Sequence, residues 1–143
     1  MKIEQISVFI ENRAGRLAEI LEIFDTNNIA IYALSIADTA NFGILRVVTD
    51  EPHRARHVLS EGNITVSLTS VISVAAKPGG HGLPDILRVL AREGLTVEYM
   101  YAFAHAEDGK GEVRDYVILR VEQDERAIDA LTAAGYSGMV FGG

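Results

Sequence analysis

Residues 8–31 read VFIENRAGRLAEILEIFDTNNIAI, and residues 74–97 read VAAKPGGHGLPDILRVLAREGLTV. The two stretches share their pattern of apolar residues at a constant shift of 66 residues, which takes Val8 to Val74. Solenoid proteins repeat about every 20–50 residues and do so many times. A longer period that occurs only twice indicates instead that a whole domain has been duplicated.

Each copy begins with the period of a strand and continues with the period of a helix. Apolar residues alternate with other residues between positions 6 and 10, as in a strand with one buried face. Residues 12–15 interrupt this alternation. Between 17 and 24 the apolar residues fall at i, i+3, i+4 and i+7, which places them on one side of a helix.

The remaining pattern completes the order strand, helix, strand, strand, helix, strand in each copy. The predicted strands cover residues 6–10, 29–37, 42–48, 64–68, 71–76, 95–104, 116–121 and 136–141. The predicted helices carry their apolar residues within 17–24, 55–59, 83–90 and 127–131. This order places two helices on one face of a four-stranded antiparallel sheet.

The predicted fold class is therefore α+β, with two tandem ferredoxin-like βαββαβ domains. We expect domain 1 to cover residues 1–70 and domain 2 to cover residues 71–143. No linker rich in glycine, proline or serine separates them, and the apolar alternation continues in phase from Ile64 to Ala76. We therefore expect the two copies to pack together.

The composition narrows the classes of function. The 143 residues include 13 Lys and Arg against 20 Asp and Glu, a formal net charge of −7, so a nucleic-acid partner is not expected. The absence of cysteine excludes disulfides, thiol catalysis and Cys-ligated metals. No apolar run approaches the roughly 18 residues of a membrane helix. We expect a cytoplasmic protein with no membrane partner, no metal and no cofactor.

The stretch Glu11-Asn12-Arg13-Ala14-Gly15-Arg16-Leu17 resembles the Asn-(Lys/Arg)-Pro-Gly-x-Leu loop of the ACT domain, a regulatory module that binds small molecules. It follows an apolar strand and opens a helix, as it does in that family. Essentially the whole chain resembles small stand-alone proteins made of two ACT domains. Ala14 stands where the family has proline, and the second loop, from Lys77 to Leu83, has its Pro-Gly pair earlier than the family pattern.

The first loop is a candidate binding site for physical reasons as well. A helix N-terminus has unpaired backbone N–H groups and a partial positive charge, so a carboxylate can bind there. Gly15 lets a ligand approach the backbone, and Asn12 offers both a donor and an acceptor. The alternative interpretation is that Asn12 only caps the helix and Gly15 only turns the chain.

The resemblance implies a free amino acid as ligand, bound between copies or between subunits of a homodimer. The first loop would contact its charged ends, residues 29–31 would border its side chain, and the second loop is the equivalent site in the other copy. The predicted ligand-binding residues are Asn12, Arg13, Ala14, Gly15, Arg16, Leu17, Ile29, Ala30, Ile31, Gly79, Gly80, His81, Gly82 and Leu83.

Other chemistry receives less support from the sequence. His53 and His57 are four residues apart on a predicted helix and offer two metal ligands, but the pattern shows no third, which favours a solvated helix face. No motif places a histidine beside a nucleophile. An enzyme that uses His81 or His105 with a nearby carboxylate stays an alternative, as does a structural dimerisation module.

The sequence therefore predicts a non-enzymatic sensor or regulatory protein that binds a free amino acid and passes the signal to a separately encoded biosynthetic enzyme. The main alternative is a regulatory subunit that acts by protein–protein contact on such an enzyme. Acetolactate synthase, whose small subunit carries a related domain, is an example of such an enzyme.

Overall fold

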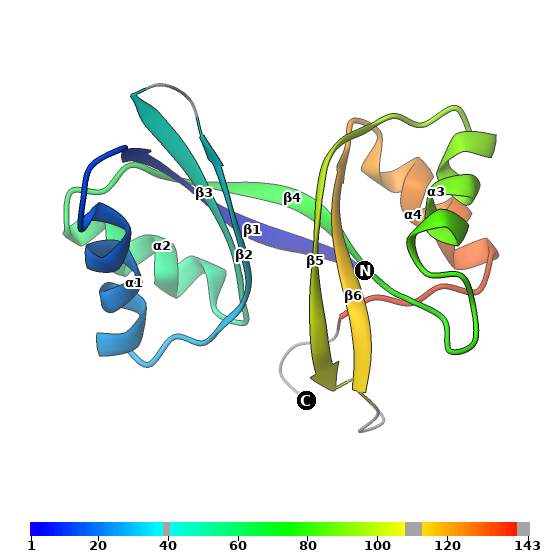
Figure 1. Ribbon diagram of the computed structural model, residues 1–143, viewed down its shortest axis with the longest axis horizontal. Helices are drawn as coiled ribbons and strands as arrows, with labels where there is room; N and C mark the ends of the chain where they lie inside the picture. Colours follow the sequence, from blue (N-terminus) through cyan, green and yellow to red (C-terminus); the bar gives the residue numbers. More distant parts are fainter. Residues whose placement is uncertain (39–40, 108–112, 140–143) are drawn as a thin grey trace. The chain divides into compact units, whose positions relative to one another are not determined.

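The computed structural model describes residues 1–38, 41–107 and 113–139, which form six strands and four helices (Figure 1). Every pair of strands with an assigned register is antiparallel, and the predicted α+β class is confirmed. The elements are β1 (Lys2–Glu11), α1 (Arg16–Thr26), β2 (Ile31–Asp38), β3 (Phe42–Thr49), α2 (Pro52–Glu61), β4 (Val66–Ala75), α3 (Leu83–Arg92), β5 (Val97–Glu107), β6 (Val113–Val121) and α4 (Asp124–Ala133).

The chain divides into two compact units. The N-terminal unit is Glu4–Thr69, and the C-terminal unit combines Met1–Ile3 with Ser70–Gly143. Strand β4 belongs to both, because its residues continue through the boundary without a break. The two strands predicted at 64–68 and 71–76 are therefore joined into one, as the unbroken alternation of apolar residues allows.

The N-terminal unit has the strand order β2-β3-β1-β4, and α1 and α2 lie together on one face of its sheet (Figure 1). Alternation along β1 turns Ile6, Val8 and Ile10 to the helices and leaves Phe9 on the opposite face, 54% exposed. Pro52 begins α2, where its missing N–H costs no hydrogen bond. The buried core consists of Ile6, Val8, Ile10, Ile20, Phe24, Ile29, Leu45, Val47, Ala55, Leu59 and Ile64.

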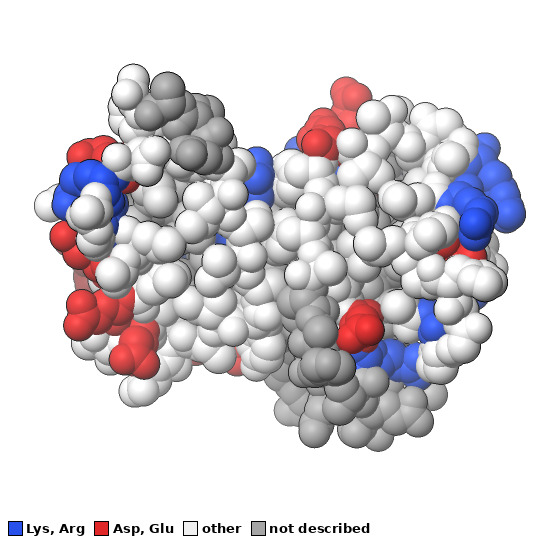
Figure 2. Space-filling view, viewed as in Figure 1, with Lys and Arg blue, Asp and Glu red and all other residues white. Residues whose placement is uncertain are grey.

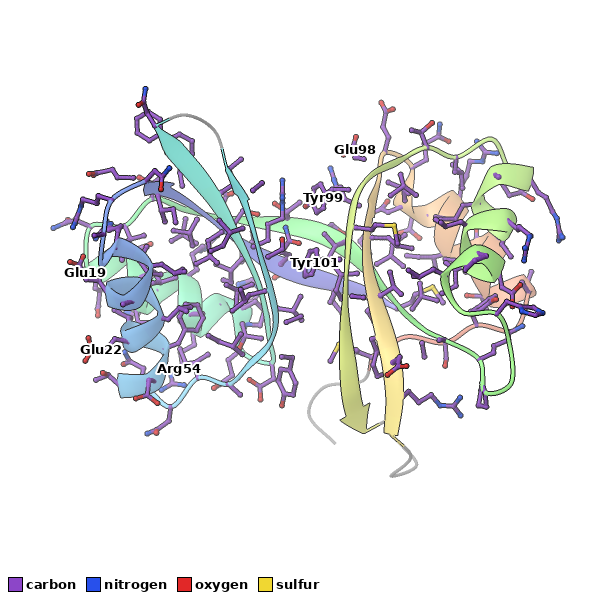
Figure 3. The ribbon with its side chains drawn as sticks, viewed as in Figure 1. Glu19, Glu22, Arg54, Glu98, Tyr99 and Tyr101 are labelled. Carbon is purple, nitrogen blue, oxygen red and sulfur yellow. The ribbon has the colours of Figure 1, made fainter. Side chains whose placement is uncertain are left out.

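The C-terminal unit has the strand order β4-β6-β5, with α3 and α4 on one face of its sheet (Figure 1). Tyr99 and Tyr101 project from β5 on the side away from those helices (Figure 3). The first residues of the chain are part of this unit, because Ser73 N–H donates to Met1 O at 2.8 Å. Its buried core consists of Ile72, Val74, Ile86, Leu90, Val117, Leu119, Val121, Ala127, Leu131 and Tyr136.

The last predicted strand, 136–141, does not form over residues 136–139, and the remainder lies outside the described residues. The backbone of this segment is engaged in other ways. Tyr136 N–H donates to Leu131 O at the end of α4, and Met139 N–H donates to the Ser73 hydroxyl at 2.6 Å. Among residues 136–139, only Ser137 makes a backbone hydrogen bond to a strand of the sheet: its carbonyl accepts from Ala75 N–H of β4 at 2.8 Å.

All four helices end in the same way. After each helix comes one residue with a positive φ, followed by an apolar residue whose N–H donates to the carbonyl five residues earlier at 2.9–3.1 Å. This is the Schellman arrangement, in which asparagine and glycine tolerate the left-handed conformation. The positive-φ residues are Asn28, Asn63, Gly94 and Gly135, and the apolar residues are Ile29, Ile64, Leu95 and Tyr136.

Candidate functional site

Residues Asn12 to Gly15 form a tight loop between β1 and α1. Asn12 N–H donates to Asn41 O at 3.1 Å, and Arg16 N–H donates to Arg13 O at 3.3 Å. Gly15 precedes the helix in a left-handed conformation, with φ +82°. A Cβ atom placed on Gly15 would have no other heavy atom within 4 Å, so the space over this backbone is open.

The N-terminus of α1 keeps unpaired donors beside this open space. No side chain caps the helix. Glu19 N–H donates to Gly15 O, whereas the N–H groups of Leu17 and Ala18 meet no backbone acceptor within the described ranges. Such donors, together with the helix dipole, favour an anion. Leu17 itself is half-buried against the core.

Charged side chains of both signs surround the loop. Arg16 Nη1 lies 3.1 Å from a carboxylate oxygen of Glu19, and Arg13 contacts Glu19 at 3.4 Å and Glu11 at 3.5 Å. The hydrogen bond from Arg16, followed by the charge of Arg13, lowers the pKa of the Glu19 carboxyl. Arg16 Nε is enclosed and has no acceptor among the described residues. Basic side chains gather at this loop and acidic ones along α1 (Figures 2 and 3).

The loop before α3 has a different arrangement. Gly79 and Gly82 have positive φ angles, and Gly80 N–H donates to Lys77 O at 3.1 Å. His81 N–H donates to the Asp85 carboxylate at 2.8 Å, and this bond is the main reason why the Asp85 pKa is lowered.

Around this second loop, the His81 residue and the Leu83 side chain are exposed, Leu83 to 38%. Lys77 is held in place, because its ammonium group donates to Ala134 O and lies 4.2 Å from the centre of the Tyr136 ring.

The fold does not bring residues 29–31 to the first loop within the N-terminal unit. Ile31 is paired with Thr49 and Glu11 with Phe42, at opposite ends of β3. These ends are roughly 23 Å apart at about 3.3 Å per residue. Ile29 is buried as the residue that closes the end of α1, Ala30 is exposed, and Ile31 is half-buried against the core.

A cavity that the sequence reasoning missed lies in the C-terminal unit, where β5 begins and β6 ends. Its volume is about 360 Å³. Two carboxylates give it an acidic character, and one of them, Glu98, lies 3.4 Å from Arg120 Nε. No motif signals this cavity, because its residues come from two separate segments. It is lined by Gly94, Leu95, Thr96, Glu98, Glu122 and Gln123.

The two histidines considered as metal ligands, His53 and His57, are on the surface. His53 Nε2 lies 2.8 Å from Glu4, and His57 Nε2 lies 3.0 Å from Glu61, each imidazole being more than two-thirds exposed. No group of three or more metal-binding side chains gathers in the part of the chain that the structure describes. The side chain of His105 lies outside the described residues.

No helix in the described ranges is long and apolar enough to cross a bilayer.

Comparison with known proteins links this architecture to a family. Residues 1–137 match the family described as an ACT domain pair. A protein of solved structure from Bacteroides thetaiotaomicron is 32% identical, with a TM-score of 0.85 over 96% of this chain and 91% of that chain. No curated protein sequence matches the chain.

Two further solved structures share the fold. The ligand-free regulatory subunit of aspartate kinase from Thermus thermophilus has a TM-score of 0.61 at 19% identity, over 92% of this chain and 91% of that chain. The corresponding subunit from Thermus flavus has a TM-score of 0.54 at 20% identity, over 94% of this chain and 95% of that chain.

Proposed function

The chain belongs to the family of ACT domain pairs, and from this membership we propose that it is a non-enzymatic regulatory protein that senses a free amino acid. The ligand binds at the loop Asn12 to Leu17 in the cytoplasm, and its binding alters a contact with a separately encoded enzyme. A ligand shifts such an equilibrium only as far as its affinities for the two states differ.

The observation that carries this proposal is the open backbone at Gly15. The helix N-terminus behind it offers unpaired N–H groups, and nothing in the described structure occupies the space above it. Arg13 and Arg16 add two cations at the rim. A carboxylate at this position would receive hydrogen bonds from the backbone and charge from the arginines.

A zwitterion suits the loop better than a simple anion does. Glu11 and Glu19 place carboxylates within 3.5 Å of the same guanidinium groups. A bound amino acid would set its carboxylate toward Arg16 and the helix, and its ammonium group toward these acidic side chains. Charges of both signs at one loop are the arrangement expected for such a ligand.

The site is completed by a second copy of the chain. Within the N-terminal unit, residues 29–31 lie at the far end of the sheet from the first loop, so a side-chain pocket that includes them needs a partner. Strand β2 is at the edge of this sheet, and Tyr32, Leu34 and Ile36 on it are each about 40% exposed. An apolar edge strand favours pairing, which supports a homodimer.

A thermal-shift screen of the twenty amino acids, on wild type and on Gly15→Asp, tests the proposal. Gly79→Asp is the matched control, because Gly79 also has a positive φ and open space around it. We expect one or two amino acids to raise the melting temperature of wild type and of Gly79→Asp but not of Gly15→Asp. A hundredfold excess over Kd gives about 2.7 kcal/mol of stabilisation. No shift at millimolar concentrations would reject a free amino acid as the ligand.

A regulatory subunit that acts by protein contact is the second candidate. Phe9 and Phe42 support it. Their ring centres are 4.9 Å apart in a stacked pair, yet Phe9 is 54% exposed and Phe42 is 42% exposed. The relatives described as aspartate kinase regulatory subunits share this fold. Co-purification with a large catalytic chain of amino-acid biosynthesis, such as acetolactate synthase, would favour it, and the double variant Phe9→Ser, Phe42→Ser should then abolish the association.

A further inference from the structure

Helices α1 and α3 are equivalent elements of the two units, because the shift of 66 residues relates their sequences. The side chains that they expose nevertheless have opposite charges. On α1 the exposed residues include Glu22 and Asp25, and on α3 they include Arg88 and Arg92. Glu22 and Arg88 are related by the shift, so the same place on the helix has an anion in one unit and a cation in the other.

Few of these four charges are paired within the chain. Glu22 points away from the sheet (Figure 3), and neither it nor Asp25 or Arg92 makes a side-chain hydrogen bond or an ion pair with any described residue. Arg88 has a partner, Asp85, at 2.7 Å. Like charges three or four residues apart on a helix repel each other. Each helix therefore has a like-charged pair that a surface of opposite charge would compensate.

The charged groups beside these two faces are neutralised within their own unit. Each of them has an oppositely charged partner on the same element or on the neighbouring one. The pairs are Arg16 with Glu19, Arg54 with Glu51 and Arg126 with Glu93. The uncompensated charge is therefore negative on the exposed face of α1 and positive on that of α3, and Figure 2 shows acidic side chains along α1 and basic ones over α3.

We propose that the exposed face of α1 docks against the exposed face of α3 in a second copy of the chain. Opposite charges steer the two faces into contact, and like charges disfavour the pairing of α1 with α1 or of α3 with α3. Each chain has both faces, so association continues from chain to chain until it closes into a ring or forms an open row. Exposed ion pairs contribute little individually, and the contact is therefore weak and reversible.

Sedimentation velocity of the full chain tests this contact in about 0.01 M and about 1 M sodium chloride, where the Debye length is about 30 Å and about 3 Å. The α1 face is reversed by Glu22→Arg with Asp25→Arg, and the α3 face by Arg88→Glu with Arg92→Glu. The net charge changes from −7 to −3 in the first variant and to −11 in the second. Both variants remain acidic, so their net charges do not attract them to each other.

Glu122→Arg with Asp129→Arg is the matched control. It also changes the net charge to −3, at two exposed residues that are on neither helix. Circular dichroism checks that the variants are folded. If the reversal on α1 prevents folding, Glu22→Gln with Asp25→Asn removes the same charges with less change of shape.

We expect wild type and the control to associate in low salt but not in high salt, and each face variant to associate about tenfold more weakly or not at all. An equal mixture of the two face variants should recover the association, because the basic α1 of one meets the acidic α3 of the other. The proposal is overturned if wild type does not associate in low salt, or if either face variant associates as wild type does. It is also overturned if the control loses the association, or if the mixture does not recover it.

Discussion

Arg54 and Arg126 make the same contact in the two halves of the chain: each guanidinium donates a hydrogen bond to the backbone carbonyl at the end of the preceding helix. The acceptor is Asn27 O for Arg54 and Glu93 O, at 2.7 Å, for Arg126. These acceptors are the residues that cap α1 and α3. In both units a cation therefore meets the negative end of a helix dipole.

We predict that Arg54→Ala and Arg126→Ala each lower the free energy of unfolding by about 0.3–1 kcal/mol, the usual value of a cation at a helix C-terminus. Arg56→Ala is the control, because Arg56 is on the same helix as Arg54 and makes no hydrogen bond or ion pair in the described structure. Urea denaturation measures the differences. If Arg56→Ala is as destabilising as the other two substitutions, the hydrogen bonds to Asn27 O and Glu93 O make no specific contribution to stability.

Gly138 is the position where the C-terminal segment is packed most tightly. A Cβ atom there would be 2.4 Å from Ser73 O and 2.6 Å from Met1 Cα. We predict that Gly138→Ala lowers stability by about 1–3 kcal/mol, since overpacking forces the backbone to shift. Ser137→Ala, at an exposed neighbour, should leave the urea midpoint almost unchanged. Equal midpoints for the two variants would show that this segment is not held as described.

The proposed dimer is tested at β2. Leu34→Glu and Ile36→Lys place charges on an apolar sheet edge, and we predict that either converts a dimer into a monomer in size-exclusion chromatography with light scattering. Leu83→Glu controls for the loss of an exposed apolar side chain elsewhere, because Leu83 is exposed to a similar degree. If the β2 variants keep the wild-type mass, the proposed dimer does not use this edge.

The two arginines of the first loop should contribute to affinity. We predict that Arg13→Ala and Arg16→Ala each weaken binding of the amino acid found in the screen by about tenfold, which corresponds to about 1.4 kcal/mol. Arg88→Ala is the control, because Arg88 pairs with Asp85 at the second loop. Calorimetry measures the dissociation constants, and an Arg88 variant that weakens binding as much as the others would contradict a site at the first loop.

The lowered pKa of Asp85 predicts a pH-dependent contribution to stability. The cause is the hydrogen bond from His81 N–H, which is made to the ionised carboxylate. A carboxyl group with a depressed folded-state pKa stabilises the fold above its ordinary value of 3.8, and this contribution is lost as pH falls through the folded-state pKa. Wild type should therefore exceed Asp85→Ala in stability by a constant amount from pH 7 to about pH 5, and by less below that.

Denaturation curves across this pH range measure the difference. Asp129→Asn, on the surface of α4, is the control. If the difference in the free energy of unfolding between wild type and Asp85→Ala stays constant down to the lowest pH, the ionised carboxylate of Asp85 is not stabilised by His81 N–H.

Much of the fold could be predicted from the sequence, because burial on one face leaves a period that local inspection detects. The helical spacing of apolar residues from Leu17 to Phe24 lies within α1. The alternation from Ile6 to Ile10 lies within β1. The pair of strands predicted on either side of residue 70 became one strand, since alternation records which face is buried and not where a strand ends. Tyr136 was predicted to begin a strand. Its N–H instead donates to Leu131 O at the end of α4, and the period of apolar residues does not record such a contact.

The candidate site was only partly predictable, because its contacts depend on side-chain direction. The loop motif predicted that Gly15 precedes a helix N-terminus, whereas the left-handed conformation of Gly15 is known from the structure alone. Whether an acidic residue in the first turn points to the loop, as Asp85 does, or away from it, as Glu19 does, depends on where the neighbouring arginines are. The cavity beside Glu98 combines two segments that no local pattern connects.

The continuous strand β4 has a consequence for how this protein can be truncated. A cut between residues 69 and 70 severs a hydrogen-bonded strand, and it also separates Ser70–Gly143 from Met1–Ile3, which complete their unit. Truncation at this point therefore leaves each unit with an incomplete sheet. We expect either half, expressed alone, to need part of the other half to complete its sheet.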